Sequence, residues 1–133
     1  MDMNLQPHQL LQSLHVGIVV HAPDTRIVFS NPRASTLLGL TPDQLLGKVA
    51  IDPAWCFCRS DGSPMALSEY PVNQVIANGA PLHGLILGVK WPDRERMVWL
   101  LVSAFPAFDA AGSLARITVS FHDITEQKKA EAA

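Results

Sequence analysis

The side chains best suited to chemistry are two cysteines one residue apart, Cys56 and Cys58. Thiolates are ligands for zinc and iron–sulfur clusters, but such sites usually take about four ligands at recognisable spacing. The chain has no further cysteine, so we expect no metal site. Two interpretations remain: small apolar residues that pack under a loop, or a redox-sensing thiol whose thiolate the adjacent Arg59 would favour.

The five histidines are His8, His15, His21, His83 and His122. No pair of them has the helical spacing of a metal-binding motif, and the sequence lacks both a phosphate-binding glycine loop and a serine flanked by glycines in a nucleophile motif. The acidic residues fall at predicted turns and helix ends, where capping and solvation explain them. We therefore expect no catalytic residues, and histidines that make structural hydrogen bonds.

The amino-acid composition indicates a single globular domain. The chain has 133 residues, of which 48% are hydrophobic and 17% charged, enough for a packed core in a single domain. A net charge of -2 provides no basic field for nucleic acid. No apolar run approaches the ~20 residues that span a bilayer, and no leader is recognisable. The two cysteines are too close in the sequence for a disulfide that would join distant parts of the fold, which suits a reducing compartment, so we expect a cytoplasmic protein.

The predicted elements are organised around residues 114–126. Ile117, Val119 and Phe121 alternate with polar residues, which predicts a strand with one core face. Asp123 then occupies an N-cap position, with Glu126 three residues on, so the strand is expected to run directly into a helix over residues 127–133. That helix has almost no apolar face and needs a partner or a continuation. This is typical of a module whose output leaves through its C-terminus.

The remaining pattern alternates short strands and helices. We expect strands at residues 17–21 and 27–30, helices starting at Pro32 and Pro42, an irregular stretch over 49–67, a helix at 71–78, and strands at 82–91, 97–105 and 114–122. An amphipathic helix over residues 7–16 either packs on its own domain or pairs with a second copy. Helices beside an antiparallel sheet predict an α+β domain.

The chain resembles a PAS domain, a sensory module of histidine kinases, diguanylate cyclases and related signalling proteins. The residues that carry the resemblance are Gly17-Ile18-Val19-Val20, Ile27-Val28-Phe29-Ser30-Asn31-Pro32, Leu38-Gly39, Leu46-Gly47-Lys48, Asp61-Gly62-Ser63-Pro64, Tyr70-Pro71-Val72, Gly79, Trp99 and Asp123-Ile124-Thr125-Glu126-Gln127-Lys128. The resemblance implies a five-stranded antiparallel sheet flanked by short helices, with N-terminal and C-terminal signalling helices. It divides the chain into an N-terminal amphipathic helix at 1–15, a core at 16–122 and the start of the exit helix at 123–133.

The resemblance also implies a pocket on the concave side of the sheet. Both faces of the strand at 97–105 are apolar, so periodicity alone does not choose between them; likeness to the family places Leu100 and Val102 inside. The candidate pocket residues are His21, Leu38, Trp55, Val72, Ile76, Leu100, Val102, Ile117, Val119 and Phe121. Either they enclose a small, mostly apolar ligand, or they fill the interior completely.

Two cofactors known in the family are not expected. Flavin-binding photosensory relatives carry a reactive cysteine in an Asn-Cys-Arg-Phe setting where this chain has Gly47-Lys48-Val49-Ala50. Haem-binding relatives use a histidine on the longer helix, and residues 70–79 contain none. The cofactor, if any, stays unknown.

The function implied is sensory. Asp123, Thr125 and Glu126 would relay a ligand signal to a downstream effector such as a histidine kinase or diguanylate cyclase, while the domain itself is not an enzyme. A homodimer is expected through the N-terminal helix and the outer sheet face, with no nucleic acid and no direct membrane insertion. The alternatives are a ligand-free dimerisation or protein-interaction module, and a Cys56/Cys58 redox switch.

Overall fold

A computed structural model describes residues 16–48, 56–90 and 97–132 of the chain. Almost all of the predicted N-terminal helix, and Trp55, lie outside this part. The strands are β1 Gly17–His21, β2 Ile27–Ser30, β3 Phe57–Cys58, β4 Leu82–Lys90, β5 Met97–Phe108 and β6 Leu114–Asp123. The helices are α2 Pro32–Leu38, α3 Pro42–Leu45, the 3-10 turn η1 Leu67–Glu69, α4 Pro71–Asn78 and α5 Thr125–Ala132.

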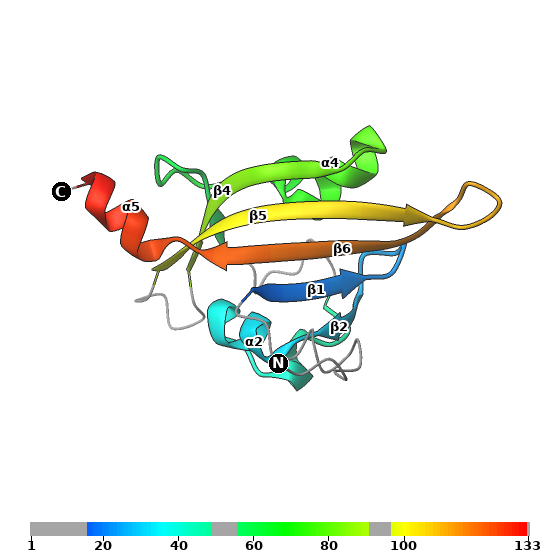
Figure 1. Cartoon of the computed structure of the whole chain (residues 1–133), viewed down its shortest axis with the longest axis horizontal. Coiled ribbons are helices and arrows are strands. Elements are labelled where there is room, and N and C mark those ends of the chain that lie inside the picture. The colour runs from blue at the N-terminus through cyan, green and yellow to red at the C-terminus, as the bar shows by residue number, and fades with distance from the viewer. Residues whose placement is uncertain (1–15, 49–55, 91–96, 133) are drawn as a thin grey trace, which may run out of the picture.

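The strands form one antiparallel sheet in the order β2-β1-β6-β5-β4-β3. The predicted meander of three long strands is confirmed, and β1 pairs with β6, so the N-terminal hairpin closes the sheet on one side (Figure 1). The predicted α+β architecture, an antiparallel sheet flanked by short helices, is confirmed, with six strands in place of five. The additional strand, β3, has two residues that pair with Val89 and Gly88. We predicted this segment as loop, because two residues are too few to show a period.

The helices begin where the sequence offers caps. Asn31 caps α2 by accepting from Ala34 N at 3.0 Å, and it also accepts from Ile18 N at 2.9 Å. This side chain is 1% exposed, so it ties the start of α2 to β1 from inside the core. Thr41 and Gln44 form the predicted capping box of α3.

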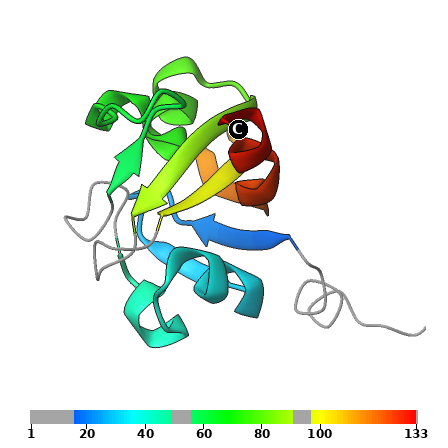
Figure 2. The ribbon, with the colours of Figure 1, turned by 90° about the vertical axis from the view of Figure 1, so that its left-hand side faces the viewer.

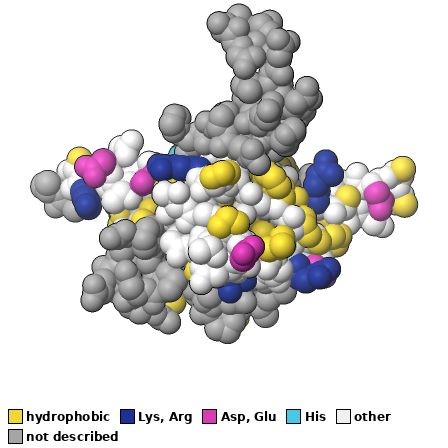
Figure 3. All heavy atoms as spheres, turned by 90° about the horizontal axis from the view of Figure 1, so that it is seen from below, with side chains coloured by type: hydrophobic (Ala, Val, Ile, Leu, Met, Phe, Trp, Pro, Cys, Tyr) yellow, Lys and Arg dark blue, Asp and Glu magenta, His cyan; other side chains and the backbone are white. Residues whose placement is uncertain are grey.

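The helices cover one face of a curved sheet. In the ribbon, α4 packs across β4, β5 and β6, whereas α2 packs on β1, and Figure 2 shows these helices above and below one end of the strands. The buried apolar residues lie between the two layers. The tip of the β5–β6 hairpin and α5 project from opposite ends of the body (Figure 3). Among the described helices, none has both the length and the apolar character needed to cross a membrane.

Candidate functional site

A cavity of about 60 Å³ lies between the sheet and the helices. All six strands of the sheet contribute to one wall, and α2, Tyr70 and the start of α4 supply the other. The lining residues are Val19, His21, Ile27, Leu38, Phe57, Tyr70, Pro71, Val72, Leu87, Val89, Leu100, Val102, Val119 and Phe121. The lining is therefore apolar except at His21 and Tyr70.

Seven of the ten candidate pocket residues line this cavity: His21, Leu38, Val72, Leu100, Val102, Val119 and Phe121. Ile117 is completely buried in the core but does not line it. Ile76 was assigned wrongly, since it is 44% exposed. The buried arc of α4 runs through Pro71, Val72 and Val75, and Ile76 lies beyond its edge.

Half of the lining was missed by sequence reasoning: Val19, Ile27, Phe57, Tyr70, Pro71, Leu87 and Val89. One signal was available, because Val19 is two residues before His21 on a strand and so shares its face. Leu87 and Val89 lie in a strand that was predicted correctly, but its faces were not assigned. Phe57 and Tyr70 come together only through the short strand β3, with ring centroids 4.6 Å apart.

His21 is the main polar group of the cavity, and its side chain is held in one tautomer. The imidazole Nδ1 lies 2.7 Å from the Thr25 carbonyl oxygen. A carbonyl only accepts, so Nδ1 carries the hydrogen and donates it, and Nε2 of the neutral ring is an acceptor. Within the described part of the chain, Nε2 has no hydrogen-bond partner.

Burial lowers the pKa of His21, and the hydrogen bond with Thr25 opposes this shift only in part. The residue is 6% exposed, so the desolvation of an imidazolium dominates. The ring is therefore neutral at neutral pH. It presents an uncharged acceptor to an apolar space.

Tyr70 supplies the second polar group. Burial raises the pKa of its phenol, while a hydrogen bond with the Phe57 backbone acts in the opposite direction. The phenol thus stays protonated at neutral pH, and its oxygen already has a partner. Among the described residues, none of those that line the cavity has a charged side chain.

The volume limits what fits. A water molecule needs roughly 10–15 Å³ of such space, and a dry engineered cavity of about 150 Å³ binds benzene. At about 60 Å³, the cavity admits a molecule of a few heavy atoms. A flavin or a haem does not fit between these walls as they stand, because sites for large ligands have volumes of about 300–1,000 Å³.

The other candidate residues meet where β6 passes into α5. The backbone ladder between β5 and β6 ends with Leu100 opposite Asp123, after which Ile124 N donates to Trp99 O at 2.8 Å. Trp99 N donates to Thr125 Oγ1 at 3.1 Å. A threonine side chain thus takes the place of the next strand carbonyl, and it attaches the first residue of α5 to the sheet.

Asp123 has a different position from the one predicted. It is the last residue of β6, and the helix starts at Thr125. Its Oδ1 accepts from Thr125 N at 2.9 Å and from the Thr125 hydroxyl at 2.6 Å, so it holds that hydroxyl with its lone pairs toward Trp99 N. Glu126 lies in the first turn of α5, but the described contacts include no reciprocal capping bond to Asp123. The capping box was wrong, because one residue, Ile124, separates the end of β6 from the start of α5, so Asp123 lies one position too early to be the N-cap.

A second attachment of α5 was not predicted. Lys128 Nζ donates to the Ser60 carbonyl at 2.7 Å and to Ser60 Oγ at 2.9 Å, and it lies 4.7 Å from the centre of the Trp99 ring. Lys128 and Ser60 are 68 positions apart in the sequence, so no local sequence pattern predicts their contact. Ser60 belongs to the turn that follows β3.

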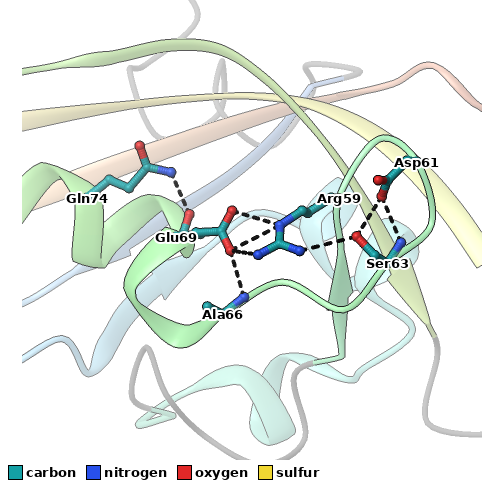
Figure 4. A network of polar contacts seen from close by, with 6 residues as sticks. All are labelled: Arg59, Asp61, Ser63, Ala66, Glu69 and Gln74. Carbon is teal, nitrogen blue, oxygen red and sulfur yellow. Dashed lines mark hydrogen bonds and ion pairs between the residues drawn. The ribbon is translucent and has the colours of Figure 1, made fainter.

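Polar contacts hold that turn against η1 (Figure 4). Arg59 Nη2 lies 2.5 Å from Glu69 Oε1, and Arg59 Nε also donates to both oxygens of this carboxylate. The hydrogen bond with Arg59 lowers the pKa of Glu69, and the Ala66 backbone N–H adds to the effect. On the other side of the turn, the Ser63 hydroxyl donates to Asp61. Since Glu69 precedes Tyr70, the turn is connected to the wall of the cavity.

The cysteine pair lies on and beside β3. Cys58 is buried and Cys56 is partly exposed, and neither forms a disulfide bond. Within the described residues, no group of three or more histidine, cysteine, aspartate or glutamate side chains is placed to hold a metal ion.

Comparison with known proteins gives a consistent result. The sequence profile of the family described as PAS fold matches residues 11–129. No curated protein matches the chain significantly.

Solved structures of similar fold share 14–20% sequence identity with the chain. The PAS domain of a protein from Colwellia psychrerythraea has 16% identity and a TM-score of 0.68, with 94% of this chain and 99% of that one covered. The PAS domain of nitrogen regulation protein NR(II) from Vibrio parahaemolyticus has 14% identity and a TM-score of 0.66, covering 91% and 100%. An RNA-binding Light-Oxygen-Voltage receptor has 20% identity and a TM-score of 0.71; 96% of this chain is covered, but it spans 37% of the receptor. At these identities the likeness shows the fold.

Proposed function

The chain belongs to the PAS fold family of signalling sensory modules, and we propose that it binds a small ligand in the cavity behind β5 and relays occupancy through Thr125 to a downstream effector. The effector would be attached through α5 and would be of the histidine kinase or diguanylate cyclase type. The domain itself acts as a sensor rather than a catalyst.

One observation carries this proposal: the residue of β5 that lines the cavity is adjacent in the chain to the residue of β5 that binds the segment leading into α5. Leu100 is 1% exposed and lines the cavity. The residue before it, Trp99, binds the exit segment through both its N–H and its carbonyl. A strand directs side chains across the sheet and hydrogen bonds within it. A displacement of β5 by a ligand therefore acts directly on the bonds to Thr125 and Ile124.

The experiment combines a binding screen with a local readout. Freshly purified protein is examined by native mass spectrometry for a bound mass, and by thermal shift against neutral molecules of up to six heavy atoms. Each molecule that binds is then tested by amide hydrogen exchange at Ile124 and Lys128, whose N–H groups donate to Trp99 O and Ile124 O.

The proposal expects a bound species that changes exchange at both amides while the β4–β5 ladder stays protected. Binding without any change at α5 would contradict the relay. The absence of every bound mass and every thermal shift would contradict the sensor and favour a ligand-free module.

The alternative function is dimerisation with no ligand sensed. It is favoured by large apolar side chains exposed on β4 and β5: Ile86 at 36%, Phe105 at 39% and Phe108 at 52%. His83 packs edge-on against Phe105, with ring centroids 5.3 Å apart. A dimer through this outer sheet face would dissociate in a Phe105→Glu variant, as measured by analytical ultracentrifugation. Unchanged sedimentation would exclude this face as the interface.

A further inference from the structure

We propose that the ligand of the cavity is a compact, uncharged molecule that carries one O–H or N–H donor, and that this donor binds Nε2 of His21. The inference rests on the proposed function and specifies the ligand class of the same site.

The need for a donor follows from the tautomer of His21. Its Nδ1 donates to the Thr25 carbonyl, so Nε2 is left as an acceptor. The residue is 94% buried, lines the cavity, and Nε2 has no partner within the described residues. A ligand that covers Nε2 without offering a donor would deprive it of any hydrogen bond to water, whereas a ligand that brings a donor would satisfy it.

The remaining lining excludes charge. Of the fourteen lining residues, only His21 and Tyr70 carry polar side chains, and both are neutral at neutral pH. An ion would lose its hydration in this space without gaining a countercharge. The oxygen of Tyr70 already bonds with the Phe57 backbone, so one acceptor at His21 is the polar feature that selects the ligand.

Size completes the description. About 60 Å³ is less than half the volume of the engineered cavity that binds benzene. The ligand class is therefore a short-chain alcohol or a small heterocycle with an N–H group. Propan-2-ol and acetone are suitable probes, because each has four heavy atoms and a similar shape, but only the alcohol donates a hydrogen bond.

The test is a pair of titrations followed by NMR on isotopically labelled protein. Methyl resonances of Leu100 and Val102 report entry into the cavity, and the ¹⁵N shift of His21 Nε2 reports hydrogen bonding to that atom. We expect propan-2-ol to bind at least about fivefold more tightly than acetone, as one hydrogen bond contributes, and to move the Nε2 resonance, whereas acetone leaves it in place.

Two variants test whether the preference for propan-2-ol over acetone depends on the imidazole of His21. His21→Phe keeps a ring in the cavity and removes the acceptor, so the preference for the alcohol should disappear while acetone binds as before. His83→Phe is the matched control, because His83 lies on the exposed outer face of the sheet, and it should retain the full preference. If His21→Phe does not fold, the Nε2 shift in the unmodified protein decides alone.

The outcomes separate this inference from the function on which it rests. Equal affinities for the two probes, or an Nε2 resonance that neither probe moves, would overturn the donor assignment; a cavity that holds only water gives the second result. Equal binding that still changes exchange at Ile124 and Lys128 would overturn the ligand class and leave the relay supported. Selective binding of the alcohol without a change in exchange at these amides would support the ligand class and overturn the relay.

Discussion

The hydroxyl of Thr125 should decide whether the exit helix stays attached to the sheet. In a Thr125→Val variant the side chain keeps its shape and its β-branch, but Trp99 N loses its acceptor and Asp123 loses a donor. An unsatisfied buried donor costs about 1–3 kcal/mol. The Trp99 bond is only partly buried, so we expect the lower end, about 1 kcal/mol.

The destabilisation caused by Thr125→Val should be confined to α5. Among the described elements, the main packing of α5 is on β5, so detachment of the helix leaves the rest of the sheet intact. A change of about 1 kcal/mol increases the population of the detached state about fivefold. Amide exchange at Ile124 and Lys128 should accelerate by that factor, while the exchange of β4 and β6 amides and the urea midpoint change little.

Two comparisons make the result interpretable. Thr36→Val is the control, because the Thr36 hydroxyl donates to Pro32 O within α2 and, among the described contacts, accepts no hydrogen bond from the sheet; exchange at α5 should be unaffected. Asp123→Ala removes the group that orients the Thr125 hydroxyl and should show a weaker form of the same local effect. If Thr125→Val leaves α5 exchange unchanged, or accelerates exchange equally across all strands, the attachment argued here is wrong.

Three further perturbations follow from single contacts. Gly17→Ala should destabilise the fold by about 1–3 kcal/mol in urea denaturation, since its Cβ would come within 2.7 Å of Phe121 Cδ2; adding Phe121→Leu should recover most of the loss, and no recovery would show that the clash lies elsewhere. Thr25→Gly should stabilise by up to about 1 kcal/mol, because a β-branched residue at φ 76° is strained; a lower melting temperature would contradict this. Stability should also fall as pH drops below 6.5: the pKa of His21 is lowered in the folded state, so the unfolded chain takes up the proton first, and the slope of up to about 1.4 kcal/mol per pH unit ends at the folded pKa. Urea denaturation from pH 7.5 to 4.5 should show this component in the unmodified protein and in His83→Phe, but not in His21→Phe; the same slope in all three would assign it to other groups.

Local signals in the sequence were sufficient for most elements. The alternation of residues 117–122 gave β6, and the Asn31-Pro32 and Thr41-Pro42 pairs gave the starts of α2 and α3. These features depend on residues within one turn or one strand, so a single sequence contains them. The same holds for Val72 on the buried side of α4.

The features that were missed depend on contacts between distant segments. The pairing of β3 with β4 involves two residues and becomes visible only once Val89 is in place. The bond of Lys128 to Ser60 joins residues 68 positions apart. The exposure of Ile76 depends on where α4 sits across the sheet, and its helical position alone was compatible with either environment.

The two walls of the cavity both connect to the first turn of α5, and this arrangement bears on how a sensor of this kind would act. The sheet wall reaches the helix through Trp99 and Thr125. The opposite wall reaches it through Glu69, Arg59 and the turn that carries Ser60, which Lys128 binds. Residues three apart lie on the same side of a helix, so both attachments hold one face of α5 at adjacent levels. On the proposed function, a ligand that moves the walls apart would pull the two attachments in different directions and turn the helix about its axis, an output that a single attachment would not produce.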